Sequence, residues 1–492
     1  MLVMVMIEYG AILSNIPFRT SKFYGGSGRF LIMGLNLGGK WGIIRAHMVG
    51  NRLQIGMAGL GTVGSGVYEA LLKNRKLLEA RAQISYDVRR VAVRDVSRPR
   101  EVDIASEMLT DDWRSLVADP EIDIIIELIG GTAEAYKLVR AALEAGKPVV
   151  TGNKALLAEY GSELFLLSTQ KGTPLYFEAS CGGGIPIVQS LQNSLICNKV
   201  NSIVGIINGT SNYILTSMAE AKLPMREALA QAQELGYAEA DPSFDINGWD
   251  AAHKGLILAM LAYGTPLSPD KIDVRGIEDI EPEDFEHAAR LGYTIKLLVV
   301  IKHHPESRAL ELRVQPSFVP EDHLLSKVDD VFNAIAVNGD IVGETIFYGR
   351  GAGKNPTSSA VVSDVVLAMR ECRLTGYHTG FHTYESDDVE KAEVLAPDDT
   401  VTPFYVRFRV QRDRCGVIAD IATAFSTHGI NISATSSSDG APDENGVHWN
   451  SLVFILHACR WGQLREALQE LSRLNTVKDR PVVLRMETFQ DT

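Results

Sequence analysis

The sequence predicts an α/β protein in three parts: a Rossmann-type doubly wound parallel sheet, an α+β domain, and a C-terminal βαββαβ domain. Three observations predict this fold class. Short apolar runs alternate with amphipathic segments from residue 53 onward. The glycine-rich turn AGLGTVGSG stands between a strand and a helix. A shorter strand and helix alternation fills roughly the last 90 residues. A chain of 492 residues is long enough for about three domains.

Composition and charge narrow the classes of partner. The chain is 46% hydrophobic and 22% charged, as in ordinary globular proteins. Its 61 acidic and 48 basic residues give a net charge of −13, so we expect no nucleic-acid partner, although a local basic pocket for an anionic cofactor remains open. The five cysteines form no CxxC pair. They favour free thiols and a cytoplasmic location over a disulfide framework or a zinc site.

Residues 1–52 are expected to be a poorly ordered extension. The first ten residues lack a basic residue and include Glu8, so they make a poor signal peptide. The later run FLIMGLNLGGKWGII is interrupted by Lys40 and is too short to span a membrane. Met48 stands just before the first patterned strand, so we expect the natural start near it, with an N-terminal address signal as the alternative.

The predicted Rossmann domain covers residues 53–184. Its strands are expected in RLQIGMAG, DVRRVAVRD, IDIIIELIGG, KPVVTG and TPLYFEAS. The third of these is apolar throughout, which is typical of a strand buried on both faces of a parallel sheet. The amphipathic segment AEAYKLVRAALEAG predicts a helix that ends at Gly146.

The remaining boundaries follow from changes in pattern. A catalytic α+β domain is expected over residues 185–345, with a hairpin signalled by Asn338-Gly339. Residues 346–372 open with a glycine-rich turn and are expected to complete the first domain as a helix. Polar residues 373–400 form a linker, and residues 401–492 form the last domain.

The glycine turn predicts a dinucleotide site. Gly59 allows a tight turn, Gly61 lets the backbone approach a pyrophosphate, and Gly64 lets helix and strand pack closely. Thr62 and Val63 would then offer main-chain N–H groups at the helix N-terminus to the phosphates. The alternative is a tight turn that binds nothing.

The next strand bears on the choice of nucleotide. It ends in VAVRD, where Asp95 suits a ribose hydroxyl and Arg94 suits a 2′-phosphate. Arg98 and Arg100 follow, so NADP is favoured, while NAD stays open.

A cluster of acids before an apolar helix predicts a site for a cationic substrate. Asp250 and Lys254 are four residues apart and share a helix face. Their apolar neighbours favour a proton-delivering lysine over a surface salt bridge. Glu239 and Asp241 precede this helix, where they could hold an ammonium group.

Two further motifs suggest ligands. In FEASCGGGIPI, three glycines leave carbonyl oxygens free to bind a monovalent cation beside Glu178; a hinge is the alternative. Lys154 follows the strand predicted in KPVVTG, near the cofactor edge of such a sheet.

These motifs, together with GIINGTSNYIL and GRGAGKNPTSSAVVSD, occur in one order over residues 53–372 and resemble the homoserine dehydrogenase family. The C-terminal module is similar to an ACT domain. The resemblance implies interconversion of L-aspartate 4-semialdehyde and L-homoserine with NAD(P)H, in threonine, methionine and isoleucine synthesis. It implies a homodimer or homotetramer, with L-threonine as an effector at the turn of residues 413–416.

The resemblance also assigns roles to residues of this chain. Lys254 is implied as the proton donor, oriented by Asp250, with Lys154 beside nicotinamide and substrate. The residues implied to bind the substrate are Glu239, Asp245, Gly209 and Lys154. Thr132 and Gly351 would touch the cofactor. A sodium site would be formed by Glu178 with the backbone of Cys181, Gly183 and Ile185.

Two other functions remain open from the sequence. One is another amino-acid-pathway oxidoreductase, in which Cys181 would be the candidate nucleophile. The other is a non-catalytic sensor of an amino acid and a nucleotide.

Overall fold

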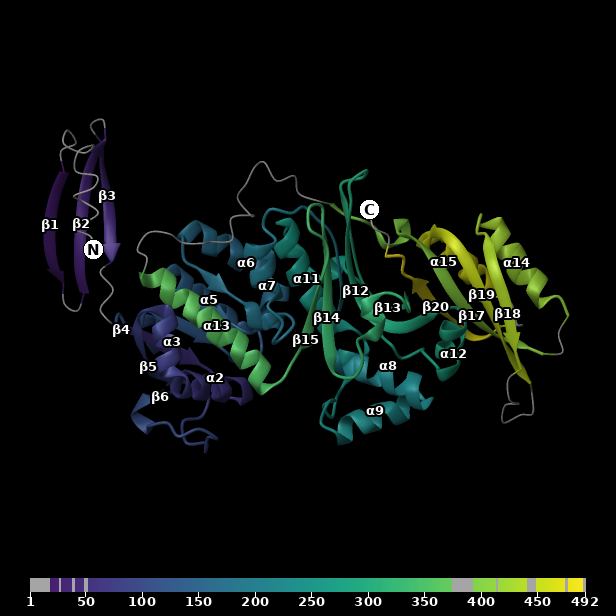
Figure 1. Ribbon diagram of the computed structural model, residues 1–492, viewed down its shortest axis with the longest axis horizontal. Helices are drawn as coiled ribbons and strands as arrows, with labels where there is room; N and C mark the ends of the chain where they lie inside the picture. Colours follow the sequence, from purple (N-terminus) through teal and green to yellow (C-terminus); the bar gives the residue numbers. More distant parts are fainter. Residues whose placement is uncertain are drawn as a thin grey trace. The chain divides into compact units, whose positions relative to one another are not determined.

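The structure is a computed structural model. It describes residues 52–373, 393–412, 415–439, 448–473 and 477–489, and the backbone of residues 18–25, 28–37 and 40–47 (Figure 1). The described residues from 52 onward form two compact units. The first contains residues 52–152, 164–176 and 361–373, and the second contains residues 153–163, 177–360 and 393–489. Each unit is described by itself.

The first unit contains a six-stranded parallel sheet in the order β6-β5-β4-β7-β8-β9. Its strands are β4 (Arg52–Ala58), β5 (Ser85–Ala92), β6 (Leu109–Thr110), β7 (Ile124–Glu127), β8 (Val149–Thr151) and β9 (Leu175–Tyr176). The order reverses between β4 and β7, so ligands are expected at the carboxyl ends of these two strands. The doubly wound sheet predicted from the sequence is confirmed.

The helices of this unit lie between its strands in sequence, except the last, which follows β9. They are α2 (Thr62–Lys73), α3 (Arg75–Ala82), η1 (Ser106–Met108), α4 (Arg114–Ala118), α5 (Ala133–Glu144), the end of α6 (Lys154–Lys171) and most of α13 (Lys354–Arg373). Strand β7 is fully buried, as its apolar sequence predicts.

The second unit is built on an antiparallel sheet with the order β15-β14-β10-β12-β13. The strands are β10 (Val200–Ile206), β12 (Tyr293–His304), β13 (Ala309–Pro320), β14 (Phe332–Gly339) and β15 (Gly343–Arg350), and the short β11 (Asp273–Val274) pairs with β13. The predicted hairpin is confirmed as β14–β15. Its turn is residues 340–342, because Asn338 and Gly339 still pair across the two strands.

Helices α8 and α11 pack against this sheet. The helical segments here are η2 (Glu178–Ser180), α7 (Ile187–Gln189), η3 (Ser190–Ser194), α8 (Gly209–Ala221), α9 (Met225–Glu234), α10 (Ser243–Ile246), α11 (Trp249–Tyr263), η4 (Pro269–Lys271), α12 (Pro282–Arg290) and η5 (Leu324–Lys327). Almost every residue of α11 between Asp250 and Leu261 is buried, which makes it the central helix of the unit.

The C-terminal module has the predicted βαββαβ order. It consists of β17 (Val401–Gln411), α14 (Val417–Thr427), β18 (Ile432–Ser438), β19 (Trp449–Arg460), α15 (Trp461–Leu471) and β20 (Val477–Met486), preceded by β16 (Glu393–Val394) and η7 (Pro397–Asp399). Aromatic residues of β17 and β19 form its core with the two helices. The predicted linker lies in part outside the described residues, at 374–392.

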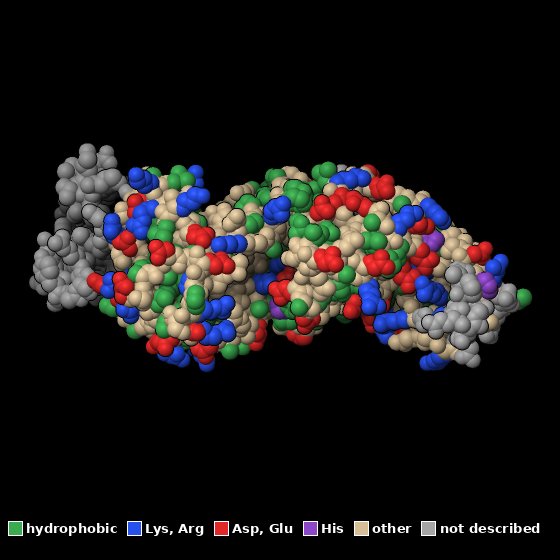
Figure 2. Space-filling model, turned by 90° about the horizontal axis from the view of Figure 1, so that it is seen from below, with side chains coloured by type: hydrophobic (Ala, Val, Ile, Leu, Met, Phe, Trp, Pro, Cys, Tyr) green, Lys and Arg blue, Asp and Glu red, His purple; other side chains and the backbone are tan. Residues whose placement is uncertain are grey.

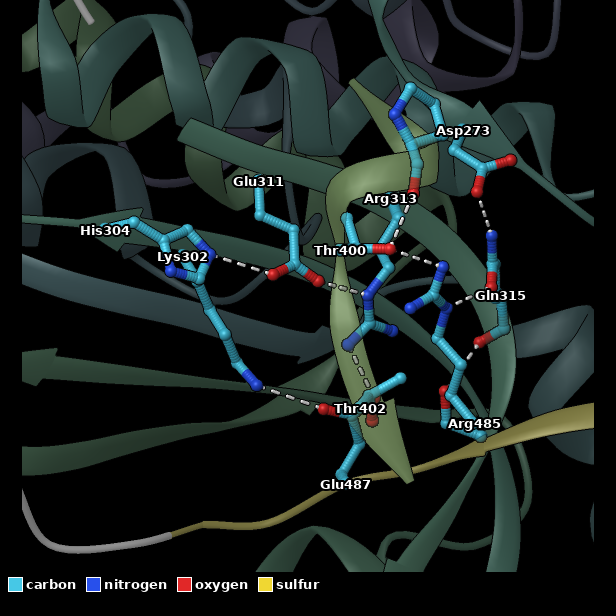
Figure 3. Close-up of polar contacts among 12 residues, drawn as sticks. Asp273, Lys302, His304, Glu311, Arg313, Gln315, Thr400, Thr402, Arg485 and Glu487 are labelled. Atoms are coloured by element: carbon cyan, nitrogen blue, oxygen red, sulfur yellow. Dashed lines mark hydrogen bonds and ion pairs between the residues drawn. The ribbon is translucent and has the colours of Figure 1, made fainter. Parts of the chain in front are cut away.

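The module does not stand apart from the sheet before it. Strand β20 pairs in parallel with β13, so the two sheets form one continuous sheet. Arg313 of β13 donates to Glu487 at 2.6 Å and to Glu311 at 2.7 Å, and all three side chains are buried (Figure 3). The sequence did not predict this junction, since charged residues in a strand usually face water.

Three strands also form in the N-terminal segment. β1 (Phe18–Gly25), β2 (Gly28–Leu37) and β3 (Lys40–His47) pair antiparallel in sequence order. The sequence had predicted no regular structure in this segment.

The charged side chains on the surface are of both signs, as the composition of the chain leads one to expect. On the face shown in Figure 2, acidic and basic side chains are interspersed. Among the residues that the structure describes, we find no helix with the length and apolar character needed to cross a bilayer.

Candidate active site

The glycine turn after β4 has the geometry of a phosphate cradle. Gly59 has φ +101°, and a Cβ there would lie 2.3 Å from the carbonyl oxygen of Leu128. A Cβ at Gly64 would lie 2.4 Å from the carbonyl oxygen of Gly59, so helix and turn are in backbone contact. Gly61 faces open space, and Thr62 and Val63 begin α2. The cradle therefore presents main-chain N–H groups at a helix N-terminus.

A cavity of about 1100 Å³ adjoins this turn. Its lining includes Gly59, Gly61 and Thr132, the residue that precedes α5. It also includes four charged residues of the segment after β5, namely Arg94, Asp95, Arg98 and Arg100. Hydrogen bonds from Ser97 hold the pKa of Asp95 below its usual range. This basic wall suits a nucleotide that carries an additional phosphate.

A cluster of two lysines and one aspartate lies in the second unit, with Asp250 and Lys254 buried and Lys154 partly exposed. Lys254 donates to Asp250 Oδ2 at 2.7 Å and to the carbonyl oxygen of Ile207 at 2.7 Å. Lys154 Nζ lies 3.0 Å from the other carboxylate oxygen, Oδ1. Asp250 is 6% and Lys254 8% exposed, so the surface salt bridge considered from the sequence is excluded.

Asn208 completes this cluster, and the sequence analysis missed it. Its amide nitrogen donates to Asp250 Oδ2 at 2.8 Å and to Asp245 Oδ1 at 2.7 Å, while its Oδ1 caps α8. An asparagine directly before a helix is a recognised N-cap signal, and this signal could have identified it. Gly209 follows and is in close contact with the carbonyl oxygen of Val331.

The charged groups of the cluster shift one another's pKa values. Burial opposes ionisation of Asp250, but Lys254 and Lys154 outweigh it and hold the pKa of Asp250 far below its usual range. Burial lowers the pKa of Lys154, but Asp250 outweighs that effect and raises it. Burial raises the pKa of Asp245, with a further contribution from the charge of Asp250. The cluster thus keeps the Asp250 carboxylate ionised between the two lysine side chains.

Glu239 and Asp241, the two acidic residues in the loop before α10, have different surroundings. Asp241 accepts at 3.1 Å from the backbone N–H of Ser243, the first residue of the short helix α10. Glu239 is exposed, and no described residue donates a hydrogen bond to its carboxylate. Its carboxylate is therefore free to bind a cation, but it is not part of the buried cluster.

The turn after β9 holds the four predicted cation ligands. Glu178 is buried and accepts from the backbone N–H groups of Val188 at 2.9 Å and Gln189 at 2.8 Å. Burial raises its pKa to about 7. The buried residue Ile185 donates to the carbonyl oxygen of Gly182 at 2.9 Å, which closes the turn.

The chemistry of this turn suits carbonyl coordination. Cys181 is buried, and burial raises the pKa of its thiol to about 12, so it is no activated nucleophile. The carbonyl oxygens of Cys181 and Gly183 accept no main-chain hydrogen bond from the described residues. Those residues also contain no group of three or more His, Cys, Asp or Glu placed to hold a metal ion. A cation here would depend on carbonyl oxygens and on Glu178.

Gly351 lies against this same turn. A Cβ at Gly183, where φ is +54°, would lie 2.4 Å from the carbonyl oxygen of Gly351. A Cβ at Gly351 would overlap the side-chain amide of Asn333. Gly183 is thus required where two backbone segments cross, and Gly351 is required where the Asn333 side chain packs against the backbone.

A dinucleotide cradle in one unit and a buried ammonium group able to protonate a carbonyl oxygen in the other define a class of protein, the nicotinamide-dependent dehydrogenases. Comparison with known proteins identifies the family. Residues 186–366 match the family model "Homoserine dehydrogenase", and residues 59–178 match "Homoserine dehydrogenase, NAD binding domain". The chain belongs to the homoserine dehydrogenase family.

Individual members of the family match this chain over most of its length. It is 41% identical to the homoserine dehydrogenase of Helicobacter pylori over 438 residues, which cover 89% of this chain and 99% of the relative. A crystal structure of a homoserine dehydrogenase from Thiobacillus denitrificans superposes with a TM-score of 0.79 at 38% identity, covering 89% of this chain and 98% of that one. A hyperthermophilic archaeal homoserine dehydrogenase in complex with NADPH has a TM-score of 0.54 at 26% identity, covering 64% and 97%.

Proposed function

We propose that the protein catalyses the NAD(P)H-dependent interconversion of L-aspartate 4-semialdehyde and L-homoserine, with Lys254 as the proton donor. The observation that carries this proposal is the buried cluster in which Asp250 binds Lys254 through one carboxylate oxygen and Lys154 through the other.

The cofactor supplies the hydride that reduces the aldehyde carbon. Lys254 provides the proton that the aldehyde oxygen needs as it becomes a hydroxyl, and it accepts that proton in the reverse direction. Asp250 fixes the direction of the Lys254 side chain through a 2.7 Å hydrogen bond. Lys154, held 3.0 Å from the same carboxylate, adds a second positive charge that would stabilise a developing oxyanion.

The substrate's ammonium group needs carboxylates near this cluster. Asp245 shares the Asn208 amide with Asp250, which places it beside the reacting lysines. Glu239 has an exposed carboxylate in the loop before Asp245, and none of the described residues donates a hydrogen bond to it. We assign substrate ammonium binding to Glu239, with Asp245 supporting it and Gly209 providing close backbone approach.

NADP is the preferred nucleotide in this proposal. The cavity beside the glycine turn is lined by Arg94, Arg98 and Arg100, which suit a 2′-phosphate. The archaeal relative named in complex with NADPH supports the same choice. Gly351 and Thr132 are assigned to cofactor contact, as the resemblance of the sequence implies.

A monovalent cation, sodium in this proposal, is assigned to Glu178 and the backbone of Cys181, Gly183 and Ile185. The buried carboxylate fits such an ion, as do two carbonyl oxygens that accept from no main-chain N–H group in the described part of the chain. The ion would neutralise Glu178 and hold the turn that crosses Gly351.

L-threonine is proposed as an effector of a homodimer or homotetramer. Asp413 and Arg414 of the predicted effector turn lie outside the described residues. Gly416 has φ +88° at the start of α14 and faces open space, which would allow a carboxylate to approach the helix N-terminus.

The test is a spectrophotometric assay of the full chain with L-homoserine and NADP, repeated with NAD and with sodium replaced by choline. We expect NADP reduction that depends on L-homoserine and is faster in sodium. Absence of turnover with both nucleotides would refute the proposed reaction.

A further inference from the structure

An aromatic pair, Phe244 and His253, lies beside Lys154 in the second unit. The Lys154 ammonium nitrogen lies over the Phe244 ring, 6.0 Å from the ring centre. His253 meets the same ring edge-on, with 5.2 Å between the ring centres and 77° between the ring planes. The Phe244 ring is therefore in contact with the ammonium group of Lys154 and with the imidazole of His253.

Both aromatic residues belong to the elements that carry the charged cluster. Phe244 is in α10, and its ring remains 42% exposed, so the ring is open to the surface on which Lys154 rests. His253 is in α11, three residues after Asp250, and the two side chains share a helix face. Trp249, at the start of the same helix, meets the imidazole edge-on with 6.3 Å between ring centres. The imidazole is thus held by aromatic rings on two sides of the cluster's own helix turn.

The surroundings of His253 favour the neutral imidazole. Its Nδ1 atom is buried, and no residue that the structure describes forms a hydrogen bond with it. A charged histidine donates from both ring nitrogens, so protonation would bury an N–H group without an acceptor, whereas the neutral ring can carry its proton on Nε2.

The charges around His253 act in the same direction. Burial lowers the pKa of His253 and the charge of Lys154 lowers it further, while Asp250 and Glu159 oppose this effect. Lys154 and Glu159 face the ring from α6, Asp250 faces it from α11, and α10 contributes the uncharged Phe244 ring.

Lys154 needs support beyond its ion pair because this pair is open to water on one side. The side chain of Lys154 is 34% exposed, whereas that of Asp250 is 9% exposed. Water weakens the attraction of an exposed ammonium group to a carboxylate, and a long lysine side chain has many other rotamers available. A ring under the ammonium group reduces this freedom by cation–π attraction.

We propose that His253 is a positioning residue for Lys154. The neutral imidazole holds the Phe244 ring in place, and this ring together with Asp250 holds the Lys154 ammonium group beside the proton donor. A positive charge at position 253 repels that ammonium group and competes with it for Asp250. The effect on turnover rests on the proposed dehydrogenase function, whereas the effect on the Lys154 ammonium group does not.

The first experiment measures kcat for L-homoserine with NADP at pH 8 in variants of the full chain. His253→Phe keeps a flat, uncharged ring against Phe244, and we expect it to retain the wild-type kcat. His253→Lys adds a permanent positive charge and should lower kcat roughly 5- to 50-fold, because like charges in a partly buried site repel each other. Phe244→Leu removes the ring under Lys154 and should lower kcat roughly 2- to 5-fold.

His303→Lys is the matched control for the added charge. His303 also stacks on an aromatic ring of α11, that of Tyr263, with 6.0 Å between ring centres. Tyr263 is the last residue of the helix, about 20 Å along its axis from Asp250. We expect His303→Lys to retain the wild-type kcat.

The ionisation of His253 itself provides a second test. The pKa of His253 lies below its ordinary value of 6.5, so the imidazole is neutral above that pH and becomes charged as the pH falls further. We therefore expect the kcat of the wild type to fall relative to that of His253→Phe between pH 7 and pH 5. Glu178 and Asp245 are present in both proteins, so the ratio of the two kcat values removes their contribution.

The reactivity of Lys154 provides a readout that does not depend on turnover. A weaker ion pair lowers the pKa of an ammonium group and leaves more of it as the reactive amine. We expect an amine-acylating reagent to modify Lys154 roughly 3- to 30-fold faster in His253→Lys than in the wild type or in His303→Lys. The rate is measured by mass spectrometry of the peptide that contains Lys154.

Two results would overturn the proposal. One is that His253→Lys and His303→Lys have the same kcat and the same rate of Lys154 acylation. The other is a ratio of wild-type to His253→Phe kcat that does not change with pH. If the melting temperature shows that His253→Lys is unfolded, the pH-dependent ratio decides. A wild-type protein without turnover refutes the proposed function instead, and the acylation rates then decide the role of His253.

Discussion

Replacing Lys254 by methionine separates the proton donor from the packing of helix α11. Methionine keeps an unbranched, flexible side chain and removes the ammonium group. In the structure, this group donates to Asp250 and to the carbonyl oxygen of Ile207, both at 2.7 Å. The variant therefore loses two hydrogen bonds and one positive charge while the buried apolar contacts of the side chain remain.

The expected loss of turnover is larger than the expected loss of stability. Removing a general acid lowers kcat by roughly 10²- to 10⁴-fold, equivalent to about 3–5 kcal/mol of activation free energy. Leaving the Ile207 carbonyl oxygen without a donor costs about 1–3 kcal/mol of unfolding free energy. Asp250 is not orphaned, because Lys154 at 3.0 Å and Asn208 at 2.8 Å remain.

The assay measures kcat and KM for L-homoserine with NADP as absorbance at the nicotinamide band. Nucleotide affinity is measured separately by titration, and the melting temperature shows that the variant is folded. Lys154→Met is the matched control, since Lys154 contacts the other oxygen of the same carboxylate. We expect the fall in kcat to be much larger for Lys254→Met than for Lys154→Met.

Two outcomes would refute the assignment. A Lys254→Met variant that keeps more than half of the wild-type kcat would show that another group delivers the proton. A larger loss of kcat in Lys154→Met, with Lys254→Met affecting only stability, would transfer the role to Lys154.

Other predictions follow from the same site. Glu239→Gln should raise KM for L-homoserine roughly 10- to 150-fold through the loss of one charged contact, and an unchanged KM would place the amino group elsewhere. Arg98→Ala should lower kcat/KM for NADP and spare NAD, so equal losses would refute a 2′-phosphate contact. Glu178 has a pKa of about 7, above its ordinary value, so ionising it costs roughly 3 kcal/mol of stability as pH rises from about 4.5 to 7. A bound cation favours the ionised form, so the increase in melting temperature from sodium over choline should grow between about pH 5 and pH 8. Glu178→Gln should remove that growth, and an increase that is independent of pH would contradict the cation site.

The sequence determined what local pattern and chemistry can specify. The alternation of apolar runs predicted a buried parallel sheet, because the strands of such a sheet must be apolar on both faces. The glycines of the turn after β4 were predicted because only glycine allows the contacts that Gly59 and Gly64 make. The spacing of Asp250 and Lys254 placed both on one helix face.

Contacts between distant segments could not be predicted in this way. Asn208 and Lys154 reach Asp250 from outside its own helix, and a hydrogen bond between segments leaves no period in the sequence. Arg313 and Glu487 are 174 residues apart, and only the pairing of β13 with β20 buries them together. The N-terminal strands were missed as well, since strand pairing depends on partners as much as on local propensity.

The sequence by itself determined the fold of each part, the residue types of the site and the family that they resemble. Tertiary structure decided which charges are buried and that the C-terminal module extends the preceding sheet. The physical reason is that burial and pairing are properties of surfaces brought together by folding, whereas propensity and periodicity belong to neighbours along the chain.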